Sequence, residues 1–172
     1  MPMASNPGIV EQAVAALLGG ELIIIPTDTV YGIAADVRDD NAVRALYAAK
    51  RRDPAAPLQL LFGSDTTLLG EYAALTEPAR SLTEALGPGA WTIVVPAREG
   101  WDSPALAGGR TVGIRIVPVD VVLEIVDRLG APLAASSANV SGGPSPATCA
   151  EAERQVGAFC ALSIDAGLTE QG

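Results

Sequence analysis

The chain has 172 residues and a formal net charge of −9, and it contains no histidine. Hydrophobic residues make up 49% and aromatic residues 4%, which allows one domain with a sizeable, mainly aliphatic core. Without histidine, a Ser-His-Asp triad, an imidazole general base and an HExxH zinc site are excluded. The negative charge disfavours a broad basic face for nucleic acid and leaves only a small local basic patch open.

Two further classes are disfavoured by the arrangement of apolar residues and cysteines. No apolar run approaches the roughly 18 residues that a membrane helix needs. The N-terminus lacks a basic region followed by a long apolar block, so we expect no secretory signal. Cys149 and Cys160 fit no CxxC pattern, which indicates reduced thiols in a cytoplasmic protein.

Helical and strand patterns alternate along the whole chain without repeats or a linker. The first half predicts a helix between Asn6 and Gly19, strands at 21–25 and 31–37, a helix from Asp39 or Asp40 to Lys50, a strand at 58–62, and helices at about 65–73 and 77–86. The second half predicts strands at 92–97 and 111–117, a helix at 119–129, a strand at 132–138, a helix from Thr148 to about Gly157, and a strand at 161–165. This order predicts one α/β domain over 1–172, with a twisted mixed sheet.

The strand at 21–25 ends in the PTDT turn (26–29), which places hydroxyls around an aspartate. This turn is either a surface loop between two strands or part of a binding pocket at a strand end. Asp28 is a candidate base or metal ligand. An aspartate in such a turn more often accepts hydrogen bonds from nearby backbone N–H groups, and we expect that role.

Two basic features stand out in this acidic chain. The KRR segment (50–52) contains the only lysine of the sequence. It is either a solvated helix end, where cations are favourable, or a site for phosphate or carboxylate. Arg115 interrupts the apolar run VGIRIV. Strand alternation directs it either to solvent or into the protein, where it would need an anionic partner such as a substrate carboxylate.

The serine-rich loop (136–148, SSANVSGGPSPAT) follows a predicted strand. Its hydroxyls, amide and glycines supply neutral donors, and its backbone N–H groups can approach an anion closely. The loop has no GK[ST] sequence and is therefore not a Walker loop. As composition alone, it is equally described as a turn.

Five stretches together resemble the YrdC/Sua5 family of threonylcarbamoyl-AMP synthases. They occur in the family's order and roughly its spacing over nearly the whole chain, and are PTDTVYGIAAD (26–36), K-R-R with the following PL (50–58), PGAWTIVV (88–95), TVGIR (111–115) and SSANVSGGPSPAT (136–148). The resemblance implies a YrdC-like fold. It also implies a reaction in which L-threonine, bicarbonate and ATP give threonylcarbamoyl-AMP and pyrophosphate.

The resemblance also implies roles for individual residues. Thr29 and Arg115 would bind the substrate threonine, while Lys50 and Arg52 would be catalytic and hold ATP phosphates and the carbamate. The remaining ATP-binding residues would be Thr111, Ser137, Asn139 and Ser145. Mg²⁺ would accompany ATP, and the product would pass to a threonylcarbamoyl transferase acting on tRNA. Direct tRNA binding by this chain stays open.

The sequence departs from the family pattern in several places. Many members have K-G-R-P and an asparagine before the PL, whereas this chain has Arg51 after the lysine and Ala56 in the asparagine's place. Members also continue with an S-T-V segment and an arginine that close over the ligands, and the given sequence reaches GLTEQG without them. We therefore expect one domain without that segment.

Two alternatives to the synthase remain open. A binding module of this family would hold nucleotide or RNA without turnover, and would bind ATP without threonine-dependent release of pyrophosphate. A related carbamoyl-adenylate-forming domain, as in hydrogenase maturation or antibiotic carbamoylation, would use carbamoyl phosphate in place of threonine and bicarbonate.

Overall fold

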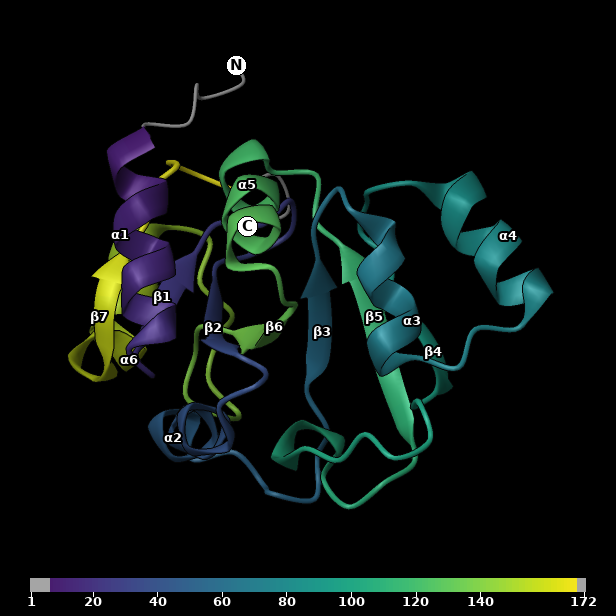
Figure 1. Ribbon diagram of the computed structural model, residues 1–172. Helices are drawn as coiled ribbons and strands as arrows, with labels where there is room; N and C mark the ends of the chain where they lie inside the picture. The colour runs from purple at the N-terminus through teal and green to yellow at the C-terminus, as the bar shows by residue number, and fades with distance from the viewer. Residues whose placement is uncertain (1–6, 170–172) are drawn as a thin grey trace.

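The structure is a computed structural model that describes residues 7–169, and within this range the strands form a single sheet (Figure 1). The sheet order is β4-β5-β3-β6-β2-β1-β7. The strands are β1 (Leu22–Ile25), β2 (Gly32–Asp36), β3 (Gln59–Phe62), β4 (Ile93–Pro96), β5 (Thr111–Ile116), β6 (Leu133–Ser137) and β7 (Cys160–Ser163). Each overlaps a predicted strand.

Both pairing directions occur, so the prediction of a mixed sheet is confirmed. The β3–β5 and β1–β7 pairs are parallel, and the other four pairs are antiparallel. The strands β5 and β6 follow one another in sequence, but β3 inserts between them in the sheet. This insertion brings residues from the second quarter of the chain beside residues from the last quarter.

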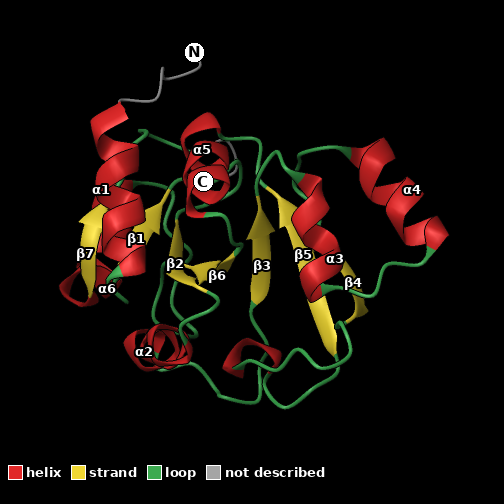
Figure 2. Cartoon of the chain, in the orientation of Figure 1, coloured by secondary structure: helices red, strands yellow, loops and turns green. Residues whose placement is uncertain are grey.

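The helices lie on both faces of the sheet (Figure 2). They are α1 (Pro7–Leu18), α2 (Asp40–Lys50), α3 (Leu69–Tyr72), α4 (Glu77–Leu86), α5 (Asp120–Leu129) and α6 (Cys149–Val156), with three short 3₁₀ segments at 66–68, 104–106 and 157–159. Two of the predicted capping residues are confirmed. Asp39 caps α2, and Thr148 forms a capping box with Glu151 at α6. The predicted cap Asn6 lies outside the described residues.

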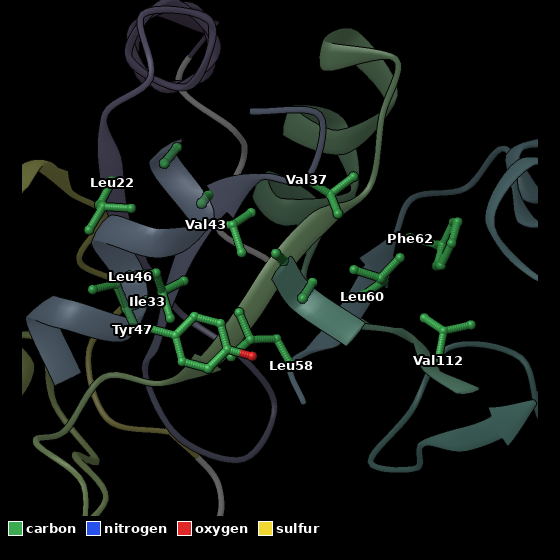
Figure 3. Close-up of a cluster of buried hydrophobic side chains, with 14 of the residues drawn as sticks. Leu22, Ile33, Val37, Val43, Leu46, Tyr47, Leu58, Leu60, Phe62 and Val112 are labelled. Atoms are coloured by element: carbon green, nitrogen blue, oxygen red, sulfur yellow. The ribbon is translucent and has the colours of Figure 1, made fainter. Parts of the chain in front are cut away.

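Two apolar clusters sandwich the sheet. Alternate residues of each strand point to opposite faces, so Leu22 and Ile24 belong to one cluster and Ile23 and Ile25 to the other. The first cluster lies under α2, α3 and α6, and Figure 3 shows how aliphatic side chains of the strands meet Tyr47 there. The second cluster lies under α1 and α5, which pack side by side in Figure 1.

The helix α4 is the least embedded of the helices (Figure 1). Thr83 is its only buried residue, while Leu82 and Leu86 are exposed. Over the part of the chain that the structure describes, no helix is long and apolar enough to cross a membrane.

Candidate active site

Strand pairing brings several strand ends to one edge of the sheet. Gly32, the first residue of β2, pairs with Ile25 at the end of β1 and with Ser137 at the end of β6. Gln59, the first residue of β3, pairs with Ala135 near the same end of β6. The PTDT turn, the serine-rich loop and the segment that leads from the KRR segment into β3 therefore meet at this edge. This arrangement favours the interpretation of the PTDT turn as part of a strand-end pocket.

Lys50, the last residue of α2, is buried, with 1% of its surface exposed. Its Nζ donates hydrogen bonds to the carbonyl oxygens of Ser137 and of Asn139, the latter at 2.6 Å, and to Asn139 Oδ1 at 3.4 Å. Burial and the neighbouring charge of Arg52 lower the pKa of Lys50 to about 8. The interpretation as a solvated helix end is wrong for Lys50, because its side chain ties α2 to the serine-rich loop.

The serine-rich loop is held in shape by Asn139. Ser137 Oγ donates to Asn139 Oδ1 at 2.5 Å, and Asn139 Nδ2 donates to the carbonyls of Val140 and Gly143 at 3.1 and 2.8 Å. The structure thus joins three predicted residues, Lys50, Ser137 and Asn139, in one network. Ser145 of the same loop is exposed and has no side-chain hydrogen bond within residues 7–169.

The two remaining basic side chains of the KRR segment differ in environment. Arg51 is exposed. Arg52 is half-buried, and its guanidinium donates to the carbonyls of Ala56 at 3.2 Å and Pro57 at 2.9 Å. Since Arg52 holds only neutral carbonyl oxygens, an incoming phosphate would offer it a stronger, charged acceptor.

Thr27 organises the PTDT turn. Its buried Oγ1 accepts hydrogen bonds from the backbone N–H groups of Thr29 and Val30, both at 3.2 Å, and donates to the carbonyl of Val30. The same oxygen lies 3.1 Å from Thr29 Oγ1. Thr27 therefore fixes the position of Thr29, and it also fills the backbone-bonding role that the sequence assigned to Asp28.

Asp28 instead pairs with Arg115, so the expected local role of Asp28 is wrong. Arg115 Nη2 lies 2.5 Å from Asp28 Oδ1, and Arg115 Nε donates to the carbonyl of Gly89 at 3.2 Å. The two side chains are only 10% and 13% exposed. The prediction that an inward Arg115 requires an anionic partner is confirmed, and the alternative that it points to solvent is excluded.

Tyr31 links the PTDT turn to the last described residues. Its buried hydroxyl donates to the carbonyl of Gly167 at 2.8 Å and accepts from the N–H of Ala166 at 2.9 Å. Burial is the main cause of the rise in the Tyr31 pKa to about 12, and the nearby carboxylate of Asp165 adds to it. The chain after β7 is thus fastened beside the candidate site, which the sequence did not reveal.

The predicted ATP-binding residue Thr111 is the first residue of β5 and is exposed. It makes no side-chain hydrogen bond within the described range. Thr111 and Ser145 therefore have accessible hydroxyls, whereas Lys50 and Arg115 are buried. A cavity of about 260 Å³ lies elsewhere, between α4 and the far ends of β3 and β5, and contains none of the predicted residues.

Comparisons with known proteins decide the family. The Sua5/YciO/YrdC family model, described as "Telomere recombination", matches residues 15–172. The chain belongs to this family. It is 41% identical over 173 aligned residues to a putative threonylcarbamoyl-AMP synthase of Mycobacterium tuberculosis, an alignment that covers 99% of this chain and 77% of the relative.

Solved structures agree with the assignment. The H234A/Y235A variant of Pyrococcus abyssi Sua5 superposes with a TM-score of 0.91 at 30% identity, over 98% of this chain and 52% of that one. The structure of P. abyssi Sua5 complexed with L-threonine gives a TM-score of 0.88 at 32% identity, over 95% and 48% of the two chains. The expected YrdC-like fold is confirmed, and the chain spans about half of these archaeal proteins. Relatives named as synthases support the enzyme over the binding module.

Proposed function

We propose that this chain is an L-threonylcarbamoyladenylate synthase, a nucleotidyltransferase that supplies threonylcarbamoyl-AMP for tRNA modification. The observation that carries the proposal is the buried Arg115 guanidinium, held beside the turn that positions Thr29. Such a group binds a carboxylate strongly because little water competes for it. The named relatives and the L-threonine complex of P. abyssi Sua5 support threonine as the amino acid.

The proposed reaction needs no histidine. The amine of L-threonine and bicarbonate condense to a carbamate with loss of water. A carbamate oxygen then attacks the α-phosphorus of ATP, and the bond to the leaving pyrophosphate breaks. These steps depend on the orientation of three charged partners and on neutralisation of the negative charge of the carbamate and ATP more than on a protein base.

In this proposal each residue of the site has a different role. Arg115 binds the carboxylate of threonine, and Thr29 contacts the rest of that substrate. Arg52 exchanges its carbonyl partners for phosphate or carbamate oxygens. Lys50 adds positive charge from beneath and holds the serine-rich loop, so that Ser137 and Asn139 are in place for the nucleotide. The accessible hydroxyls of Thr111 and Ser145 line the rim on the nucleotide side.

Magnesium would enter as part of the substrate. Among the described residues, no group of three or more His, Cys, Asp or Glu side chains could hold a metal ion. In this proposal Mg²⁺ is carried by the phosphates of ATP, where it neutralises charge near the reacting phosphorus.

The product has to leave for a second enzyme. Threonylcarbamoyl-AMP is a mixed anhydride and reacts readily with nucleophiles, so we propose direct use by a threonylcarbamoyl transferase that modifies tRNA. The acidic charge of −9 makes that transferase, rather than this chain, the better candidate for contacting tRNA. The two unpaired cysteines accord with a cytoplasmic location.

The test is release of pyrophosphate from ATP by the purified chain, with L-threonine and bicarbonate present together or omitted singly. We expect release only when both are present. Arg115→Gln should raise KM for threonine by roughly 10- to 100-fold, because one charged hydrogen-bonding partner of the carboxylate is lost. Arg44→Gln is the matched control, since Arg44 is an exposed arginine paired with Asp40 on α2.

ATP binding with no threonine-dependent release would contradict the synthase and favour the binding module. Release driven by carbamoyl phosphate instead of threonine and bicarbonate would favour the carbamoyl-adenylate-forming alternative.

A further inference from the structure

The Asp28–Arg115 ion pair spans the sheet. Arg115 lies in β5, whereas Asp28 follows β1, and three strands (β3, β6 and β2) separate β5 from β1 in the sheet order. The contact therefore crosses the width of these three strands and joins the PTDT turn to β5. Each partner is nearly buried, so the pair is a fixed part of the site.

The pair does not use all of its hydrogen-bonding atoms. The contact joins Arg115 Nη2 to one oxygen of Asp28, while Arg115 Nε is taken by the carbonyl of Gly89. Arg115 Nη1 and Asp28 Oδ2 have no hydrogen-bond partner within the described residues. No buried side-chain nitrogen or oxygen there is unsatisfied, so both atoms reach solvent. The pair thus presents one free donor with positive charge and one free acceptor with negative charge.

We propose that Asp28 is a substrate-binding residue that holds the α-amino group of the amino-acid substrate, while Arg115 holds its carboxylate. This inference rests on the proposed function, in which Arg115 binds the carboxylate of threonine. A zwitterionic amino acid carries opposite charges on adjacent atoms, and the ion pair offers the complementary charges side by side. Recognition of both charges selects an α-amino acid over a simple carboxylate.

The position also suits the chemistry of the amine. The nitrogen must be placed for attack on bicarbonate carbon, and a carboxylate that accepts a hydrogen bond from it fixes its direction. Because Asp28 is held by Arg115 and its turn by Thr27, its free oxygen is preorganised for this contact.

The test compares two ligands that differ only in the amine. L-threonine and (3R)-3-hydroxybutyrate are titrated by calorimetry against the wild-type chain and Asp28→Asn, which keeps the side-chain shape and removes the charge. We expect the affinity ratio of threonine to hydroxybutyrate to fall by about 10- to 100-fold in Asp28→Asn, as expected for loss of a hydrogen bond to a charged group. Asp102→Asn, an exposed aspartate, is the matched control and should keep the wild-type ratio.

The ratio separates the proposal from other roles of Asp28. If Asp28 only competes with the substrate carboxylate for Arg115, both ligands bind more tightly to Asp28→Asn and the ratio is unchanged, which overturns the proposal. If Asp28 only supports the fold, both ligands bind more weakly with the same ratio, which also overturns it. Failure of the wild-type chain to bind threonine at all would refute the proposed function itself, a result distinct from an unchanged ratio.

Discussion

Two charged side chains of the site, Arg115 and Asp28, are nearly buried and pair with each other. Arg115 could be recognised from the sequence because a guanidinium inside an apolar strand needs a partner. Its partner Asp28 could not be assigned, since pairing between residues 87 positions apart depends on the order of the strands. The local pattern around Asp28 favoured a turn contact, and Thr27, one position earlier, makes that contact instead.

The burial of the Lys50 side chain could not be predicted from the sequence either. Its family motif indicates phosphate binding, yet the pattern of a basic helix end gives no sign that the side chain is buried. The structure shows that its charge is shared among the acceptors of Ser137 and Asn139. A role in holding the loop therefore accompanies any role in catalysis.

Replacement of Lys50 tests that structural role. Lys50→Met keeps a long aliphatic chain and removes the charged donor to the carbonyl oxygens of Ser137 and Asn139, so we expect the free energy of unfolding to fall by about 1–3 kcal/mol. Urea denaturation measures the loss. Arg44→Met on the exposed face of the same helix should change stability by less than about 0.5 kcal/mol. Equal stability of Lys50→Met and wild type would mean that the network contributes nothing to folding.

Helix ends are the elements that position the KRR segment. The caps at Asp39 and Thr148 were predictable, because a side-chain cap is local and its residue types are few. The conformation at the C-terminus of α2 was harder to predict from the sequence. Arg51 adopts a left-handed conformation with φ of 50°, and the backbone N–H groups of Arg51 and Arg52 donate to the carbonyls of Ala48 and Tyr47. This conformation explains why the K-G-R-P pattern places glycine at this position.

Arg51→Gly is therefore expected to stabilise the chain. The left-handed conformation costs a residue with a Cβ atom about 1–2 kcal/mol, and glycine removes most of that strain. We expect a rise of about 1 kcal/mol in the free energy of unfolding, measured by urea denaturation, with ATP affinity unchanged because Arg51 points to solvent. Arg51→Ala, which keeps the Cβ atom and loses the same charge, is the control. A gain in Arg51→Ala as large as in Arg51→Gly would attribute the effect to charge instead.

At the scale of the whole molecule, the fold class was predictable and the strand order was not. Alternating strand and helix patterns sufficed for an α/β domain with a mixed sheet, and every predicted strand exists. The insertion of β3 between β5 and β6 depends on pairing between distant segments, which periodicity does not encode. That order nevertheless creates the site, since it brings the PTDT turn, the serine-rich loop and Arg115 together.

The buried acidic groups predict how the whole molecule responds to alkaline pH. Burial is the largest cause that raises the pKa of every tyrosine and cysteine in the chain, namely Tyr31, Tyr47, Tyr72, Cys149 and Cys160. In the folded chain the pKa is about 12 for Tyr31 and Cys160 and about 11 for Cys149, and it is raised above the ordinary value of 10 for Tyr47 and Tyr72. The unfolded chain therefore releases these protons at lower pH than the folded chain. The folded state then binds more protons, so stability falls as pH rises through this range.

Lys50 has the opposite effect on the pH dependence of stability, between about pH 8 and 10.5. Its pKa is lowered from 10.5 to about 8, so between these values the unfolded state binds the extra proton and stability gains with pH. We expect the free energy of unfolding to rise slightly from pH 8 to about 9, where Lys50 alone contributes, and to decline steeply above pH 10.5, where only the thiols and phenols contribute. Urea denaturation under reducing conditions measures this profile. A constant or rising stability above pH 10.5 would contradict the assigned burial of the phenols and thiols.

The solitary lysine has one more consequence, for labelling chemistry. Amine acylation by an N-hydroxysuccinimide ester has only two targets in this chain, the N-terminal α-amine and Lys50. In the native state the ε-amine is enclosed, so the first acyl group should appear quickly and the second only as fast as the end of α2 separates from the serine-rich loop. Intact-mass spectrometry would count the two additions directly. The rate at which Lys50 is acylated thus reports how often the candidate site opens, and bound nucleotide should lower that rate.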